Sequence, residues 1–99
     1  MTGSASDILS LESIKILIPF LEDKNLFIPS MEVVKYEADG KGRLDMEMSM
    51  LGMDEILDWN NYQDRIKCKA IFLETIDIMS KSSCRYECQI WIDEVGNPS

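Results

Sequence analysis

Apolar residues recur with helical spacing near the start of the chain and predict an amphipathic helix over residues 7–18. Ser6 is a suitable N-cap for this helix, and Asp7 would lie beside the positive end of the helix dipole. Pro19 has no backbone N–H to donate, so the helix is expected to stop or kink there. The apolar stripe of the helix is Ile8, Leu11, Ile14, Leu17, Ile18 and Leu21.

An alternation of apolar and polar residues predicts a β-hairpin formed by residues 32–38 and 43–50. Between the two strands, residues 39–42 (Asp-Gly-Lys-Gly) supply the glycines that a tight turn with positive φ angles requires. Methionine lines both cores and adaptable binding grooves, but the phase of the methionines in the second strand favours the core. The residues expected on the inner face of that strand are Leu44, Met46, Met48 and Met50.

Residues 65–79 fit both a strand and a helix, and the pattern favours a strand. On a helical wheel, the apolar residues of this segment spread around the whole circumference. With a period of two, one face is apolar except at Glu74, and the length of the segment predicts a bulge near Leu73 and Glu74. A helix over the same residues is the main alternative. The apolar face of the strand would be Ile66, Cys68, Ala70, Phe72, Ile76 and Ile78.

Residues 84–93 alternate in the same way and predict a final strand. Residues 80–83 would join this strand to residues 65–79 as a second hairpin. The acidic segment at residues 53–62 lies between the two hairpins and suits either a short helix or an irregular loop. The inward-facing residues of the last strand would be Cys84, Tyr86, Cys88, Ile90 and Ile92.

These elements predict an α+β fold, in which an N-terminal helix packs on a four-stranded antiparallel sheet made of two hairpins, with a possible short helix between the hairpins. The 99 residues are expected to form a single domain, 1–99, with loose termini at residues 1–5 and 95–99. The face of the sheet that points away from the helix is expected to be polar and open.

The charge of the chain narrows the choice of partners. Ten basic and eighteen acidic residues give a formal net charge of −8. Such a surface repels nucleic acid and anionic membrane and suits a protein partner with a basic surface. No apolar run approaches the roughly 18–20 residues that span a bilayer, and no signal peptide is recognisable. Three cysteines, an odd number, predict reduced thiols and a cytoplasmic protein.

Motifs that carry chemistry are mostly missing from the sequence. The chain has no histidine, which excludes Ser-His-Asp and Cys-His sites and removes the commonest metal ligand. Cys84 and Cys88 have the wrong spacing for a zinc knuckle, and residues 39–45 carry basic residues where a calcium loop needs oxygen ligands. We therefore expect no metal, no cofactor and no catalytic residue. Glu74, predicted to point into an apolar face, is the one candidate proton donor for an enzyme that uses carboxylates alone.

Acidic and aromatic residues gather between the two predicted hairpins and indicate a protein-binding site. Aromatic anchors ringed by carboxylates suit a basic protein surface. The plainer alternative is a solvated acidic face with Trp59 tucked into the core. Trp91 is a second candidate, because its phase places it on the open face of the sheet. The predicted partner-binding residues are Asp54, Glu55, Asp58, Trp59, Tyr62, Asp64 and Trp91.

The leading functional hypothesis is a small acidic protein-binding module without enzymatic activity, which inhibits or neutralises a basic partner protein. Immunity proteins, antitoxins and phage anti-defence proteins share this physical profile of charge and size. The alternative is a structural subunit or homodimer that pairs through a sheet edge or through the open sheet face. An enzyme with a carboxylate-only site ranks third.

Overall fold

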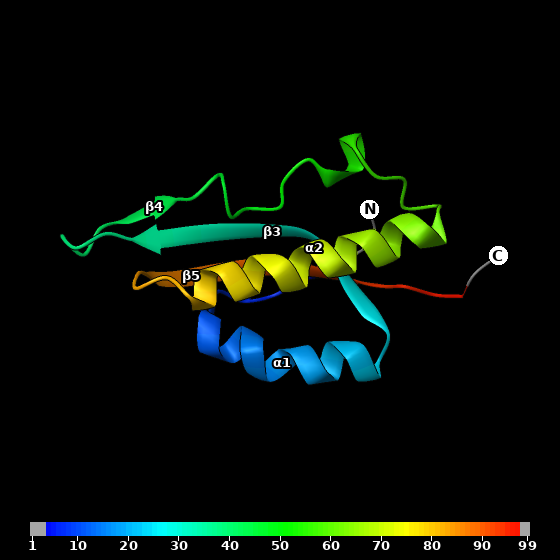
Figure 1. The fold of residues 1–99 in the computed structure, drawn as a ribbon, viewed down its shortest axis with the longest axis horizontal. Helices are drawn as coiled ribbons and strands as arrows, with labels where there is room; N and C mark the ends of the chain where they lie inside the picture. Colours follow the sequence, from blue (N-terminus) through cyan, green and yellow to red (C-terminus); the bar gives the residue numbers. More distant parts are fainter. Residues whose placement is uncertain (1–3, 98–99) are drawn as a thin grey trace.

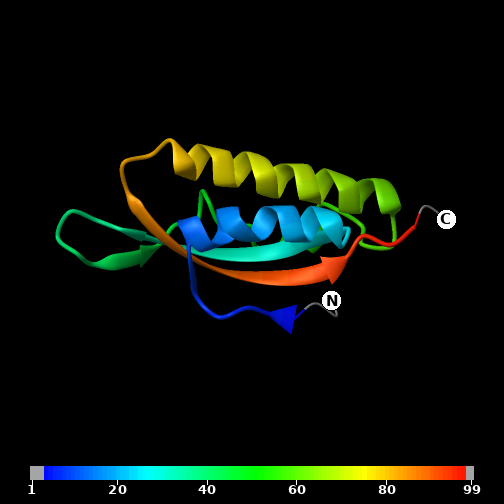
Figure 2. The same cartoon turned by 90° about the horizontal axis from the view of Figure 1, so that it is seen from below.

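The computed structural model describes residues 4–97, in which two long helices lie on one face of an antiparallel sheet (Figures 1 and 2). The α+β class, with an N-terminal helix packed on an antiparallel sheet, is therefore confirmed. In chain order, the elements are β1 (Ser4–Ala5), β2 (Leu9–Ser10), α1 (Leu11–Asp23), β3 (Leu26–Tyr36), β4 (Gly42–Leu44), the 3₁₀ turn η1 (Met53–Glu55), α2 (Tyr62–Ser80) and β5 (Arg85–Glu94).

The sheet has the order β1-β5-β3-β4, and β2 also pairs with β5. β1 and β2 use the same edge of β5, because the other edge is taken by β3, so the sheet is four strands wide. β3 and β5 form the long central pair, with Val33 opposite Cys88 and Tyr36 opposite Arg85. Figure 2 shows both helices on one side of this sheet and none on the other side.

The hydrophobic core lies between the sheet and the two helices. Tyr86, Cys88 and Ile90 of β5 are buried against the helices, so the inward phase predicted for residues 84–93 is confirmed. In register with them, Met31 and Val33 of β3 are fully buried. The helices contribute buried residues at helical spacing: Leu11, Ile14 and Leu21 from α1, and Cys68, Phe72, Ile76 and Met79 from α2.

The N-terminal helix begins and ends later than residues 7–18. Ser10, rather than Ser6, is the N-cap, and its Oγ accepts the Ser13 N–H at 3.2 Å. Ser6 instead extends the sheet: its N–H donates to the Ile90 carbonyl at 2.8 Å, and its Oγ accepts the Ile90 N–H at 3.0 Å. The predicted cap was wrong because both serines suit a cap locally, and the chain stays paired with β5 as far as Ser10 before the helix begins.

The helix also continues through Pro19 to Asp23, so the predicted stop at Pro19 was wrong. The proline ring is exposed, and the following turn carries Leu21, which is 4% exposed in the core. Burial of that side chain offsets the missing backbone hydrogen bond. The chain leaves the helix through Asn25, a non-glycine residue with φ of 52°.

The first hairpin is confirmed as β3 and β4, and it projects from the end of the molecule (Figure 1). Its turn is closed by the Glu37 N–H, which donates to the Lys41 carbonyl at 3.0 Å, and Gly40 has the positive φ of 81° that the turn requires. β3 begins earlier than predicted, at Leu26. A bulge between Phe27 and Ser30 accommodates the proline at position 29.

The second strand of this hairpin is much shorter than residues 43–50. Asp45 begins a turn, in which its Oδ1 accepts the N–H groups of Glu47 at 3.0 Å and Met48 at 3.1 Å. The chain then rejoins β3, where the Ser49 Oγ accepts the Val33 N–H at 2.9 Å. The predicted inner methionine row was therefore wrong in part. Met46 is 64% exposed and Met48 half-buried, whereas Met50 is 3% exposed.

The predicted strand at residues 65–79 is wrong, because these residues belong to α2. The second hairpin consequently does not exist, and β5 pairs with β3 instead. Residues 80–83 connect the end of α2 to β5 rather than joining two strands. The acidic segment at residues 53–62 contains only the single 3₁₀ turn η1 and an irregular loop before α2.

Parts of the predicted loose termini are held in place. Ser4 and Ala5 pair with β5, and Val95 is fully buried, with its N–H donated to the Asn25 carbonyl at 2.9 Å. The loose ends therefore do not include Ser4, Ala5 or Val95. The prediction also covers residues 1–3 and 98–99, which lie outside the described residues.

Candidate protein-binding site

An open hollow of about 700 Å³ lies beside the loop that precedes α2. Three separate parts of the chain form it: η1 with the following loop, the first turn of α2, and the end of β5. Five of its side chains are carboxylates, and the Ile56 side chain is 79% exposed. The lining residues are Asp54, Glu55, Ile56, Leu57, Asp58, Trp59, Asn60, Asp64 and Asp93.

Hydrogen bonds within the loop fix the positions of the acidic side chains. Gly52 adopts a φ of 69° and starts η1, after which the Leu57 N–H donates to the Met53 carbonyl at 2.8 Å. This turn presents Asp54 and Glu55 to solvent on consecutive positions. The acidic pair is thereby held by backbone geometry rather than by contacts of its own side chains.

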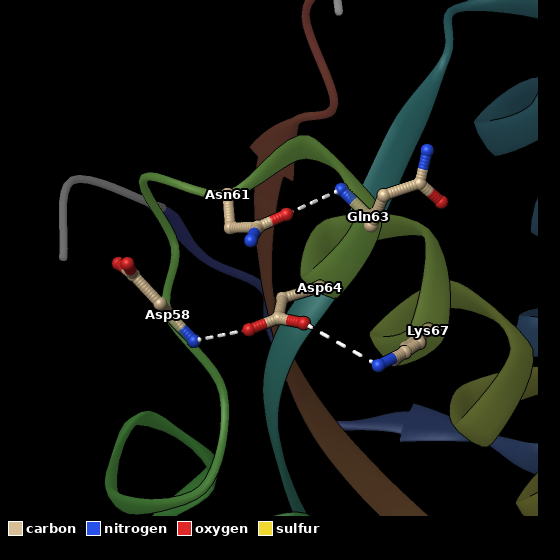
Figure 3. A network of polar contacts seen from close by, with 5 residues as sticks. All are labelled: Asp58, Asn61, Gln63, Asp64 and Lys67. Atoms are coloured by element: carbon tan, nitrogen blue, oxygen red, sulfur yellow. Dashed lines mark hydrogen bonds and ion pairs between the residues drawn. The ribbon is translucent and has the colours of Figure 1, made fainter.

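The first turn of α2 continues this arrangement (Figure 3). Asn61 is the N-cap, and its Oδ1 accepts the Gln63 N–H at 2.9 Å. Asp64 accepts the Asp58 N–H at 2.8 Å through Oδ2, while its Oδ1 lies 3.8 Å from the Lys67 Nζ. Asp64 therefore anchors the loop to the helix while its carboxylate lines the hollow.

Trp59 and Arg65 connect the loop of the hollow to the rest of the fold. The Trp59 ring packs against Phe27, with ring centroids 5.4 Å apart and the planes tilted by 55°. Arg65 donates from Nη1 to the Trp59 carbonyl at 2.6 Å and from Nε to the Val95 carbonyl at 2.5 Å. The indole is thus partly in the core and partly at the edge of the hollow.

The hollow carries a concentrated negative charge. Among the described residues, Asp54, Glu55 and Asp58 form no ion pair, whereas Asp64 has the Lys67 ammonium nearby. The Lys67 side chain is 68% exposed, so solvent screens much of that attraction. The carboxylates of the hollow therefore favour the approach of positively charged groups from solvent.

The structure brings together five of the seven predicted partner-binding residues around this hollow: Asp54, Glu55, Asp58, Trp59 and Asp64. Tyr62 does not line it. Tyr62 is the half-buried first residue of α2, and the Arg65 guanidinium lies 5.8 Å from its ring centroid. Trp91 also lies outside the hollow, on β5 opposite Ser30 and Ala5.

Four lining residues were not predicted from the sequence: Ile56, Leu57, Asn60 and Asp93. A short helix over residues 53–62 would have Ile56 on its apolar side, and only the observed loop conformation shows that it is exposed to solvent. Asp93 is distant in sequence from the acidic segment, and it reaches the hollow because β5 ends beside it. No local pattern marks that contact, since it depends on the pairing of β5 with β3.

The uncovered face of the sheet carries a separate polar cluster at the hairpin end. The Tyr36 hydroxyl donates to the Glu87 carboxylate, and the Arg85 guanidinium lies 4.0 Å from the Tyr36 ring centroid. The hydrogen bond to Glu87, together with burial, raises the pKa of the Tyr36 phenol above its ordinary value. These contacts satisfy the cluster within the chain. Trp91 lies on the same face and is half-buried.

Glu74 does not point into an apolar face, as the strand model predicted. It is exposed on the outer side of α2, because the helical period turns it away from Phe72 and Ile76. The burial on which its role as a proton donor depends is therefore not observed.

The three cysteines are free thiols, and two of them are buried in the core. Burial raises the pKa of Cys68 to about 12 and that of Cys88 to about 11. The Cys68 thiol also donates to the Ile28 carbonyl at 3.1 Å. Both thiols are therefore protonated and unreactive near neutral pH.

We expect a small alkylating reagent to modify Cys84 in the folded protein while leaving Cys68 and Cys88 unmodified. Cys84 is half-buried and thus partly accessible. At about pH 8, only about one thiol in ten thousand at Cys68 and one in a thousand at Cys88 is ionised, given pKa values of about 12 and 11. Peptide mass spectrometry against time measures the three rates. Equal alkylation rates of the three cysteines in the folded protein, without denaturant, would contradict the burial of Cys68 and Cys88.

No helix in residues 4–97 is long and apolar enough to cross a membrane. Over the same residues, no group of three or more metal-ligating side chains is arranged to hold a metal ion. Comparisons of the chain with protein-family models, with curated protein sequences and with solved structures found no match.

Proposed function

We propose that the protein is a small acidic binding module whose hollow receives a basic surface of another protein and thereby inhibits or neutralises that protein. In this proposal it acts in the cytoplasm in the manner of an immunity protein, an antitoxin or a phage anti-defence protein. Its role is occupancy of the partner's surface rather than catalysis.

One observation carries the proposal. Carboxylates from three separate parts of the chain converge on one open hollow of about 700 Å³, and the exposed Ile56 lies among them. Interfaces of this kind combine an apolar anchor with a polar rim. The formal net charge of −8 adds long-range attraction for a basic partner and would speed the encounter of the two proteins.

A photo-crosslinking amino acid placed at Ile56 tests the location of the interface. Ile16 of α1 provides a matched control, because both isoleucines are 79% exposed. Expressed in its native host, the Ile56 variant is expected to capture a basic protein that the Ile16 variant does not capture. Capture of the same proteins from both positions would place the interface elsewhere.

Charge reversal and salt then test the mechanism on the captured complex. We expect the double variant Asp54→Lys with Glu55→Lys to weaken the complex by at least about tenfold, since both side chains are exposed in the hollow. Raising the ionic strength from about 0.05 M to about 0.5 M is expected to weaken the wild-type complex by a similar factor. Calorimetry or biosensor titration measures both changes.

The matched control is the double variant Glu37→Lys with Glu47→Lys. It changes the net charge by the same amount on exposed positions of the projecting hairpin, outside the hollow. Equal weakening by the two double variants would show that only net charge matters. Binding that is unchanged both at the higher ionic strength and in the Asp54→Lys with Glu55→Lys variant would refute the proposed mechanism.

The second candidate is a structural subunit or homodimer that pairs through the uncovered face of the sheet. The observation that favours it is the position of Trp91 on that face, where no helix covers the sheet (Figure 2). Sedimentation separates the two candidates. A dimer that persists at high salt and dissociates in Trp91→Ala would support the second one.

A further inference from the structure

Arg65 stands at the meeting point of the three parts of the chain that form the acidic hollow. It belongs to the first turn of α2, directly after Asp64, and donates to the Trp59 carbonyl of the loop at 2.6 Å. Its Nε donates to the Val95 carbonyl at 2.5 Å, just beyond the end of β5. One side chain thus contacts the helix, the loop and the end of the last strand.

We infer that Arg65 is the positioning residue of the hollow, which holds the loop wall and the β5 wall at a fixed separation. This role rests on the proposed function, since only a hollow that receives a partner needs a fixed shape. Arg65 does not line the hollow itself, so it acts through the backbone of Trp59 and Val95 rather than by touching a partner.

The geometry requires arginine in particular. The Nε–H and Nη1–H groups point in different, fixed directions from the planar guanidinium, and this rigid fork of donors reaches two carbonyls that belong to segments far apart in the sequence. A lysine ammonium is a single point on a flexible stem and does not reproduce this fork.

Other hydrogen bonds also hold the two segments that Arg65 bridges, which are the loop at Trp59 and the C-terminal segment at Val95. The loop is joined to α2 by the Asp58 N–H, which donates to Asp64 at 2.8 Å. The C-terminal segment is joined to the turn between α1 and β3 by Asn25, whose carbonyl accepts the Val95 N–H at 2.9 Å and whose Nδ2 donates to the Gly96 carbonyl at 3.3 Å. Arg65 links these two units to each other, so its loss should release both walls without unfolding the sheet.

Hydrogen exchange of the free, full-length chain tests the inference without any partner. In Arg65→Lys and Arg65→Gln, we expect the amides of Asn61 and Val95 to exchange about tenfold faster or more, while amides in the middle of α2 stay unchanged. Lys15→Gln on α1 is the matched control, because it removes the same charge from an exposed position and should change neither amide. Unchanged exchange at Asn61 and Val95 in both Arg65 variants would overturn the inference.

Binding of a peptide of nine arginines supplies the second readout. Arg65→Lys keeps the net charge, so we expect an unchanged association rate and a dissociation rate raised by about tenfold. A merely structural role would lower the thermal midpoint and leave the dissociation rate unchanged well below that midpoint, which would overturn the inference. If Arg65 variants loosen both amides but the wild type does not bind the peptide, the positioning role is supported and the proposed function fails.

Discussion

Met79→Ala should destabilise the protein far more than Ile78→Ala, although the two residues are neighbours. Met79 is fully buried against the sheet, whereas Ile78 is 48% exposed. Removing a buried methionine side chain costs about 2–5 kcal/mol of unfolding free energy, and a half-exposed isoleucine on a helix costs less than about 1 kcal/mol. Urea denaturation followed by circular dichroism measures both values.

This pair distinguishes the helix from the strand. Period-two alternation places Ile78 in the core and Met79 outside, so a strand predicts the opposite ranking of the two costs. A larger loss in Ile78→Ala than in Met79→Ala would therefore contradict the observed conformation of residues 62–80. A change in the urea m-value in either variant would indicate that the unfolded or native ensemble also changed.

The strand prediction failed because α2 packs on two sides. One side of the helix meets the sheet through Cys68, Phe72 and Ile76. Another side faces α1, where Leu73 and Lys69 border a small cavity together with Ile18 of α1. A helix covered on two sides has a broad apolar arc, and exposed apolar residues widen it further. The resulting pattern has no single stripe and mimics an alternation.

Elements with strong local signals were predicted well. The turn at residues 39–42 depends on glycine with positive φ, a property of the residue itself, and the hairpin forms there. The alternation of β5 is clear because only one face of that strand is covered by helices. The start of α1 depends on how far the N-terminal segment stays paired with β5, and no local pattern contains that information.

In the candidate site, too, features that depend on neighbouring residues were predictable, whereas contacts between distant segments were not. Asp54, Glu55, Asp58, Trp59 and Asp64 are close in sequence, and a short loop brings them together, so they were grouped correctly. Asp93 joins them through sheet pairing, and Arg65 organises them through contacts with two backbone carbonyls. Neither contribution follows from the composition of the acidic segment.

Trp59→Ala should lower stability by about 2–4 kcal/mol, whereas Ile56→Ala should change it by less than about 0.5 kcal/mol. Trp59 is half-buried, and its ring packs against the buried Phe27 at a centroid distance of 5.4 Å, so truncation opens a cavity at the edge of the core. Ile56 is 79% exposed and loses little packing. Thermal and urea denaturation measure the two changes.

The difference decides how binding data for the two variants should be interpreted. A loss of partner binding in Trp59→Ala combines the loss of a contact with the loss of loop structure, and the two effects are not separable in that variant alone. Ile56→Ala keeps the loop and removes only an exposed apolar group, so a weakened complex at native stability assigns a contact to Ile56. Unchanged binding in Ile56→Ala would show that the carboxylates act without an apolar anchor. A large loss of stability in that variant would mean that the Ile56 side chain is not exposed.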